Sequence, residues 1–293
     1  MNPDSTERIL IVVGAARSGT SMLRNVIAKH PEVCCVPYDV NYLWRLGNEK
    51  LDHDELDRSL LSEATRNKIR DAISVFREPG HCLAEKTVSN ALRIPFVTAV
   101  YPEARLVHIV RNGYDVIESV RRQWVAPFEY KRVLIKAAGF PWRSSFRYAL
   151  GYVAGHIKRR VASRYSAGGT WGPRYRGIDE DLSTKSLLEV CALQWQRCVQ
   201  AATRDLSRTS GSQHITLHYE EFISDPGRHL ERIADLLDID PSAYVSGDVT
   251  AGVNCHNVGT GEHGLSATDK ITVEPIVEPV MSLLGYEKVA ASR

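Results

Sequence analysis

Short apolar runs alternate with longer amphipathic stretches along the chain. Five runs are bounded by turn or charged residues and are too short for helices, which predicts buried strands over 9–13, 33–36, 82–84, 106–110 and 215–217. Stretches with helical spacing predict helices over 21–30, 56–76, 91–100, 114–123, 184–206, 226–237 and 273–284. Strands that alternate with helices in this way predict an α/β fold, with a parallel sheet of about five strands and helices on both faces.

Length and composition fit one folded unit. The chain has 293 residues, of which 43% are hydrophobic and 25% charged, so we expect a single domain over 1–293 with an insertion at about 121–183. The first apolar run ends at Ala16 and no basic region precedes it, so neither a signal peptide nor a transmembrane segment is expected. The six cysteines lack C-x-x-C and His/Cys ligand spacing, which favours a cytoplasmic protein without disulfides or metal.

Basic and aromatic residues are concentrated between positions 121 and 177. That segment holds thirteen Lys/Arg, one acidic residue (Glu129) and eleven of the 23 aromatic residues. Such a composition is typical of a surface that recognises an acidic acceptor or a phospholipid. It is equally typical of an amphipathic helical cap whose aromatic side chains pack inward. The sequence leaves both interpretations open, and it does not indicate nucleic acid as a partner.

A phosphate-loop pattern without its usual lysine follows the first predicted strand. Residues 14–21 read G-A-A-R-S-G-T-S, and Thr20 stands where the lysine of G-x-x-x-x-G-K-[ST] reaches the β- and γ-phosphates. The strand, the tight turn and the helix start are all retained, and backbone N–H groups at a helix N-terminus bind an anion well. The pattern therefore predicts a cradle for an anion other than ATP, and a nucleotide carrying a 5′-phosphosulfate is the next candidate.

A second anion site is predicted at the end of the fourth strand. Arg111 follows that strand, and Ser119 lies eight residues later in the next predicted helix. An arginine fork and a hydroxyl placed in this way can converge on one phosphate. The pair is a stronger candidate because ligands in parallel sheets bind beyond the carboxyl ends of the strands, where the loop at 14–21 also lies.

These motifs resemble those of sulfotransferases that use 3′-phosphoadenosine 5′-phosphosulfate (PAPS). The run 17–33, R-S-G-T-S-M-L-R-N-V-I-A-K-H-P-E-V, is especially similar to tyrosylprotein sulfotransferases and their bacterial relatives. The resemblance implies that residues 17–21 bind the 5′-phosphosulfate and that Arg111 and Ser119 bind the 3′-phosphate. Glu85-Lys86-Thr87 resembles a lysine-bearing strand end of that group. Tyr219-Glu220-Glu221 resembles a turn whose tyrosine lies against adenine, and the expected donor residues are Arg17, Ser18, Gly19, Thr20, Ser21, Arg111, Ser119 and Tyr219.

Sulfuryl transfer requires alignment and neutralisation of the charge on the bridging oxygen. We expect Arg17 and Lys86 to supply the positive charge, with Thr20 and Ser21 donating to the same oxygens. No Mg²⁺ is expected, because there are no β- and γ-phosphates to bridge. Surface roles, as a solvated turn residue for Arg17 and as an ion pair with Glu85 for Lys86, are the simpler alternatives.

A hydroxyl acceptor also needs a general base. Asp39 is the leading candidate, because it lies one residue after the positions at which the tyrosylprotein enzymes carry glutamates; Glu85 and His81 are the reserves. The alternative role for Asp39 is a helix N-cap. The loop 254–264 lies where relatives contact the 3′-phosphate, but their cationic pattern is missing, so no residue there is assigned.

The sequence therefore predicts a cytoplasmic sulfotransferase that transfers a sulfuryl group from PAPS to a hydroxyl or amine. The acceptor class stays open among a phenol, a sugar, a peptide and a lipid headgroup, and a homo-oligomer is compatible with the sequence. Two alternatives remain at this point. One is a P-loop kinase of small molecules, and the other is a non-catalytic protein that binds adenosine bisphosphate.

Overall fold

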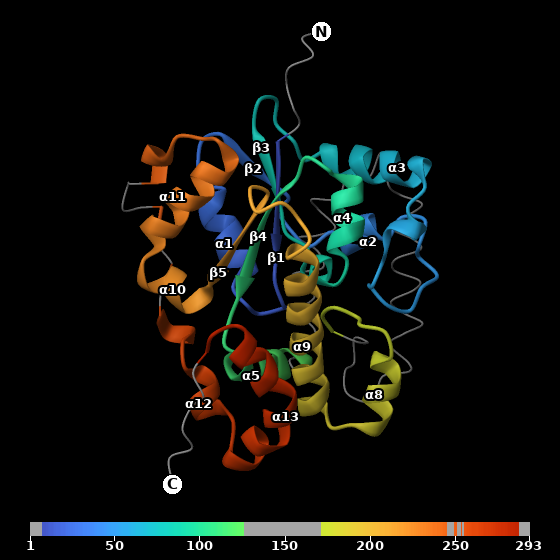
Figure 1. Cartoon of the computed structure of the whole chain (residues 1–293), viewed down its shortest axis with the longest axis vertical. Helices are drawn as coiled ribbons and strands as arrows, with labels where there is room; N and C mark the ends of the chain where they lie inside the picture. The colour runs from blue at the N-terminus through green and yellow to red at the C-terminus, as the bar shows by residue number, and fades with distance from the viewer. Residues whose placement is uncertain (1–7, 126–170, 245–248, 251–252, 254, 287–293) are drawn as a thin grey trace.

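Five parallel strands form one sheet in the order β2-β3-β1-β4-β5 (Figure 1). The structure is a computed structural model that describes residues 8–125, 171–244, 249–250, 253 and 255–286. The sheet confirms the predicted α/β class. The strands are β1 (Ile9–Val13), β2 (Val33–Cys35), β3 (Cys82–Glu85), β4 (Arg105–Val110) and β5 (His214–His218).

The central strand β1 carries the candidate loop at its carboxyl end. All five of its residues are buried, because it pairs with β3 on one side and β4 on the other and is covered on both faces. A strand buried in this way has a continuous apolar sequence, which is what predicted it. The other predicted strands differ from the observed ones by one or two residues at their ends.

Helices cover both faces of the sheet and fill the space beyond its carboxyl edge. The longer ones are α1 (Thr20–Ile27), α3 (Glu63–Ser74), α4 (Ile94–Val100), α5 (Gly113–Val125), α9 (Leu187–Leu206), α11 (Pro226–Leu237) and α13 (Ala267–Leu283). The shorter ones are α2 (Asn41–Trp44), α8 (Ile178–Thr184), α10 (Tyr219–Ser224) and α12 (Thr260–Gly264). Four 3₁₀ turns are also described, over Arg58–Leu60, Val88–Leu92, Pro241–Tyr244 and Cys255–Asn257.

Two predicted helices are wrong because serine caps divide them. The predicted helix 56–76 is a 3₁₀ turn followed by α3, which begins where the Ser62 side chain accepts from the backbone N–H of Thr65. The predicted helix 184–206 spans the end of α8 and all of α9. There Ser186 and Glu189 form a capping box that starts α9. The predicted helix 226–237 matches α11. At Tyr219, where a turn was expected, helix α10 begins.

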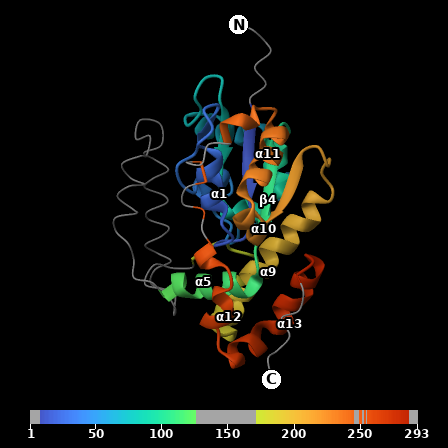
Figure 2. The ribbon, with the colours of Figure 1, turned by 90° about the vertical axis from the view of Figure 1, so that its left-hand side faces the viewer.

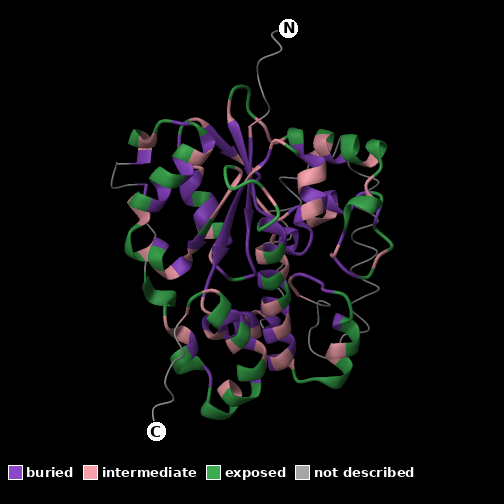
Figure 3. Cartoon of the chain, viewed as in Figure 1, coloured by how far each residue is buried: buried purple, intermediate pink, exposed green. Residues whose placement is uncertain are grey.

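The core has two layers, one on each face of the sheet. On one face α1 and α11 pack through Leu23 and Leu230 against β1 and β4. On the other face α4, α5, α9 and α13 contribute Phe96, Val116, Trp195 and Val277 to a larger cluster. Burial is therefore greatest in the strands and on the inner helix surfaces (Figure 3). Helices α5, α12 and α13 lie beyond the carboxyl ends of the strands, which is also the end at which the chain leaves β1 (Figures 1 and 2).

The buried side chain of Gln194 joins the two ends of the segment 126–170. Its Oε1 accepts from Trp124 Nε1 at 3.1 Å, and its Nε2 donates to the carbonyls of Trp171 and Pro173 at 2.8 and 3.0 Å. Most of the predicted basic and aromatic insertion lies outside the described residues. Within the described part Trp124 and Tyr175 are buried, which agrees with the inward-packing interpretation for these two side chains. No helix in the described ranges is both long and apolar enough to span a bilayer.

Candidate active site

The loop between β1 and α1 contains two residues in the left-handed conformation just before the helix begins. Arg17 and Gly19 adopt positive φ angles of 71° and 90°. A side chain at Gly19 would meet the ring of Tyr219 at 2.6 Å, so the turn tolerates only glycine there. Gly19 is also the N-cap of α1, and no side chain caps that helix. The first N–H groups of α1 are therefore left for a ligand.

Arg17 connects this loop to α5. Its Nε donates to Ser119 Oγ at 2.9 Å, and its backbone carbonyl accepts from Arg111 Nη1 at 3.1 Å. The three residues predicted to bind the two ends of one nucleotide therefore lie together, although 102 residues separate Arg17 from Ser119 along the chain. The parallel sheet explains this, because β1 and β4 are neighbours and both end at the same edge.

Arg111 is a buried cation that lies against Tyr219. The Arg111 side chain is 5% exposed, and its Cζ atom lies 4.5 Å from the centre of the Tyr219 ring. Tyr219 in turn packs against Gly19. One face of the ring is thus covered by the guanidinium group.

Two buried polar atoms in the site have no hydrogen-bond partner among the described residues. They are Ser18 Oγ and Arg111 Nε. Buried polar atoms are nearly always paired, and an unpaired one at a functional site usually awaits a ligand or water. A hydroxyl at the loop after β1 and a guanidinium N–H at the end of β4 suit an anionic ligand with two charged ends, as a phosphosulfate nucleotide has.

Lys86 and Asp39 lie beside each other at the ends of β3 and β2. Lys86 Nζ is 3.7 Å from Asp39 Oδ2, and the Lys86 and Asp39 side chains are 9% and 26% exposed. Both carboxylate oxygens also accept backbone N–H groups, from Asn41 and Val88 at 3.1 Å each. Val40, and not Asp39, is the N-cap residue of α2. The Asp39 carboxylate instead binds the backbone N–H groups of Asn41 and Val88. The carboxylate is held in place while part of it faces solvent.

The two reserve bases, Glu85 and His81, are less well placed than Asp39. Glu85 is fully buried, and burial raises its pKa to about 7. Its carboxylate accepts from Thr87 at 2.5 Å and from Asn90 at 3.0 Å, so it faces the protein interior. His81 precedes the amino end of β3, whereas Lys86 follows the carboxyl end, and the four residues between them span about 13 Å. His81 therefore lies at the opposite end of β3 from Lys86, which removes it as a reserve base beside that lysine.

Sequence reasoning missed Asp115, which fastens part of the 254–264 loop. Its carboxylate accepts the backbone N–H groups of Gly259 at 2.9 Å and Gly261 at 2.6 Å. The carbonyl of Asn257, in the same loop, accepts from Arg111 Nη2. No sequence pattern marks this arrangement, because the partners of Asp115 and Arg111 within the 254–264 loop are backbone groups.

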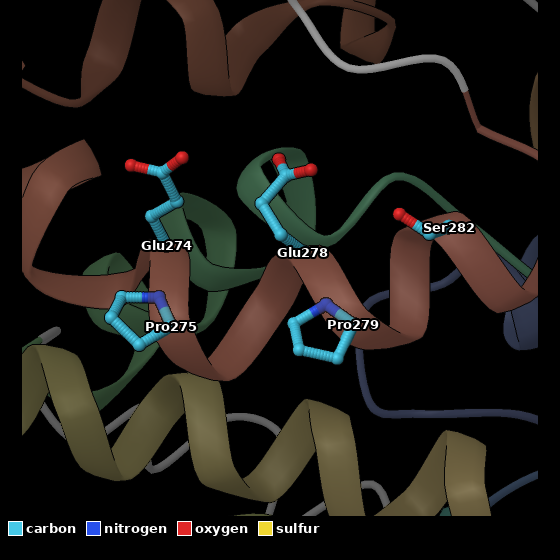
Figure 4. A pocket seen from close by; sticks show the side chains of 5 residues that line it. All are labelled: Glu274, Pro275, Glu278, Pro279 and Ser282. Carbon is cyan, nitrogen blue, oxygen red and sulfur yellow. The ribbon is translucent and has the colours of Figure 1, made fainter.

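The hollow on α13 does not suit the same ligand. Glu274, Pro275, Glu278, Pro279 and Ser282 line it (Figure 4). Its charged groups are two carboxylates, one of which accepts from the Tyr114 hydroxyl at 2.9 Å. An anionic nucleotide would be repelled there. The loop after β1 remains the better candidate site.

Comparisons with known proteins match the part of the chain that contains this loop. The Sulfotransferase family matches residues 10–139, which include the loop, Asp39, Lys86, Arg111 and Ser119. A putative protein-tyrosine sulfotransferase of Caenorhabditis briggsae is 23% identical over 150 residues, which cover 49% of this chain and 54% of that protein. Protein-tyrosine sulfotransferase 1 of Danio rerio is 25% identical over 134 residues, which cover 41% and 38%. The match thus spans about half, or less, of these relatives.

A solved structure shares the fold over nearly the whole chain. The sulfotransferase domain from the curacin biosynthetic pathway is 16% identical, with a TM-score of 0.52, and the match covers 96% of this chain and 98% of that domain. This similarity is one of fold. Over residues 10–139 the chain is also similar in sequence to the Sulfotransferase family.

Proposed function

We propose that the protein is a sulfotransferase that uses PAPS as donor and a hydroxyl or amine as acceptor. One observation carries the proposal. Arg17, Arg111, Ser119 and Tyr219 converge on the uncapped N-terminus of α1, where Ser18 Oγ and Arg111 Nε lack partners among the described residues. A nucleotide with anionic groups at both its 5′ and 3′ ends complements this arrangement.

The residues around the loop suit the two ends of such a donor. The first N–H groups of α1, Ser18, Thr20 and Ser21 would hold the 5′-phosphosulfate, and Arg111 with Ser119 would hold the 3′-phosphate. Tyr219 would contact the adenine with the part of its ring that Arg111 leaves uncovered. The donor, when bound, supplies an activated sulfuryl group on a phosphate leaving group.

Positive charge and a base are available for the transfer. Arg17 and Lys86 would neutralise the oxygen that bridges sulfur and phosphorus as its bond to sulfur breaks. Asp39 would accept the proton of the acceptor hydroxyl as the new S–O bond forms, because it is the partly exposed carboxylate beside Lys86. Glu85 is too deeply buried for this role.

The acceptor would bind beside the Asp39–Lys86 pair. A phenol is the first acceptor class to test, because the relatives named above are protein-tyrosine sulfotransferases; a sugar, a peptide and a lipid headgroup follow. The six described cysteines are all free, which supports a proposed cytoplasmic location.

A P-loop kinase is the second candidate function that the loop raises. It is disfavoured because Thr20 stands where a lysine would reach the β- and γ-phosphates. Calorimetry with 3′,5′-adenosine bisphosphate and, separately, with magnesium ATP distinguishes the two. We expect saturable heat with the bisphosphate, and the opposite result would overturn the proposal.

Transfer itself is tested with labelled donor. Purified protein is incubated with labelled PAPS and extracts of the native cell, and mass spectrometry then searches for products heavier by one sulfuryl group. Tight binding of the bisphosphate without any such product, also across a broad panel of phenols, sugars and peptides, would instead indicate a non-catalytic binding protein.

A further inference from the structure

Asp115 is a buried carboxylate whose strongest contacts are backbone amides far along the chain. It lies in the first turn of α5 and is 2% exposed. Its Oδ2 accepts from Gly259 N at 2.9 Å and its Oδ1 from Gly261 N at 2.6 Å. Bonds from N–H groups to a buried carboxylate are among the stronger hydrogen bonds in proteins. Asp115 therefore fixes the position of the segment 257–261 against α5.

The same carboxylate also orients Arg111. Asp115 Oδ2 lies 3.5 Å from Arg111 Nη2, and Nη2 donates to the carbonyl of Asn257 in the fixed segment. Nη1 donates to the Arg17 carbonyl at 3.1 Å. These bonds hold both terminal nitrogens of the guanidinium group, and Nε is left without a partner among the described residues. The direction in which Arg111 presents Nε thus depends on Asp115 and on the segment that Asp115 holds.

The segment contributes through its backbone rather than through positive side chains. Residues 255–264 read C-H-N-V-G-T-G-E-H-G and contain no lysine or arginine. Gly261 makes the close approach feasible, since a Cβ there would lie 2.4 Å from the backbone carbon of Tyr114. Recognition of a phosphate at Arg111 must therefore rely on how accurately this segment and the guanidinium group are held.

We propose that Asp115 is a positioning residue that gives the donor site its selectivity for a 3′-phosphate. By holding Gly259 and Gly261 it keeps the segment 257–261 beside Arg111 and keeps Arg111 oriented toward the 3′ end of the nucleotide. The inference rests on the proposed function, because it assumes that the site binds a 3′-phosphorylated adenylate.

The test compares two nucleotides that differ only in the 3′-phosphate. Calorimetry gives the dissociation constants of 3′,5′-adenosine bisphosphate and adenosine 5′-phosphate, and their ratio measures selectivity. In Asp115→Asn one carboxylate oxygen becomes an NH₂ group that faces a glycine N–H, so one bond is lost and two donors oppose each other. We expect the ratio to fall about tenfold or more, while the dissociation constant of adenosine 5′-phosphate changes less than about twofold.

A second variant reaches the same segment without altering Asp115. Gly261→Ala places a Cβ against the backbone of α5, so the segment must move away, and we expect a similar fall in the ratio. Gly227→Ala in α11 is the matched control, because its nearest atom would lie at an ordinary 3.9 Å. Asp269→Asn is the matched control for the carboxylate, since Asp269 accepts the N–H of Ser266 at the start of α13.

Hydrogen exchange checks the anchoring itself. The amides of Gly259 and Gly261 should exchange faster in Asp115→Asn than in the unaltered chain. The inference would be overturned if Asp115→Asn lost thermal stability but kept the ratio of the two dissociation constants. Unchanged slow exchange of the Gly259 and Gly261 amides in that variant would overturn it too. Absence of any preference for the bisphosphate in the unaltered chain would overturn the proposed function as well, so the two failures are distinguishable.

Discussion

Arg17 Nε donates to Ser119 Oγ at 2.9 Å and so ties the loop after β1 to helix α5. Arg111 adds a second tie, because its Nη1 donates to the Arg17 carbonyl. Together the two bonds hold an arginine with a positive φ of 71° in place. The groups proposed for the 5′ and 3′ ends of the donor are therefore connected by hydrogen bonds. We expect a substitution at one end to alter nucleotide binding at the other.

Arg111→Ala should weaken binding of 3′,5′-adenosine bisphosphate far more than binding of adenosine 5′-phosphate. Loss of a charged hydrogen-bonding partner for the 3′-phosphate predicts a decrease of about 10- to 100-fold for the bisphosphate. Calorimetry with both nucleotides measures the difference. Arg66→Ala, on the exposed side of α3, is the control. Equal losses for the two nucleotides would place Arg111 away from the 3′ group.

Asp39→Asn should lower turnover while leaving nucleotide affinity nearly intact. The amide keeps an oxygen that can accept one of the two backbone N–H groups now bound by Asp39, but it cannot take a proton from the acceptor. Steady-state rates with an identified acceptor test this, and a loss of about 100-fold or more is expected. Asp71→Asn, at an exposed position of α3, is the control and should turn over at the rate of the unaltered chain. Full activity in Asp39→Asn would remove Asp39 as the base.

The contribution of His108 to stability should fall in mild acid. This side chain is fully buried on β4, and burial, followed by the nearby His214 and His218, lowers its pKa from 6.5 to about 4. Between these two values the unfolded chain binds more protons than the folded one. The stabilisation is therefore complete above about pH 6.5 and is lost as the pH falls toward 4, by about 3 kcal/mol in total.

Urea unfolding between pH 4 and pH 8 measures this effect. Relative to the unaltered chain, His108→Leu should gain stability as the pH falls from about 6.5 toward 4, whereas His263→Gln, at an exposed position, should follow the unaltered chain. An unaltered slope in His108→Leu would assign the acid sensitivity to other groups. Glu85 acts in the opposite direction, since its raised pKa makes the folded chain hold a proton longer than the unfolded one. The His108 contribution is therefore best obtained as a difference between variants.

Gln194→Ala should destabilise the fold by about 2 to 3 kcal/mol, because it leaves Trp124 Nε1 and the carbonyls of Trp171 and Pro173 without their partner. The free energy of unfolding from urea titrations provides the measurement. Binding of 3′,5′-adenosine bisphosphate should change little, because Gln194 touches none of the donor residues. The control is Gln200→Ala on the exposed side of α9. A large loss of nucleotide affinity would show that the two regions are coupled.

Much of the sheet could be predicted because buried parallel strands leave a clear sequence signal. β1 is apolar at all five positions and was predicted with its correct ends. Helix ends were harder to predict, since the signals are single polar residues. Ser62 and the pair Ser186–Glu189 each start a helix, and both lie inside stretches that read as continuous helices by hydrophobic spacing.

The candidate site was predictable where it depends on strand ends and not where it depends on backbone groups. Arg17, Arg111 and Ser119 converge because β1 and β4 are neighbours, which a parallel sheet favours. The contacts of Asp115 join it to amides more than 140 positions away. Backbone N–H groups are present at almost every residue, so no pattern of side chains could identify the two that Asp115 binds.

Gln194 accepts a hydrogen bond from the Trp124 side chain and donates hydrogen bonds to the backbone carbonyls of Trp171 and Pro173. Since a single amide binds both flanks, the relative position of these two segments depends on one side chain of α9.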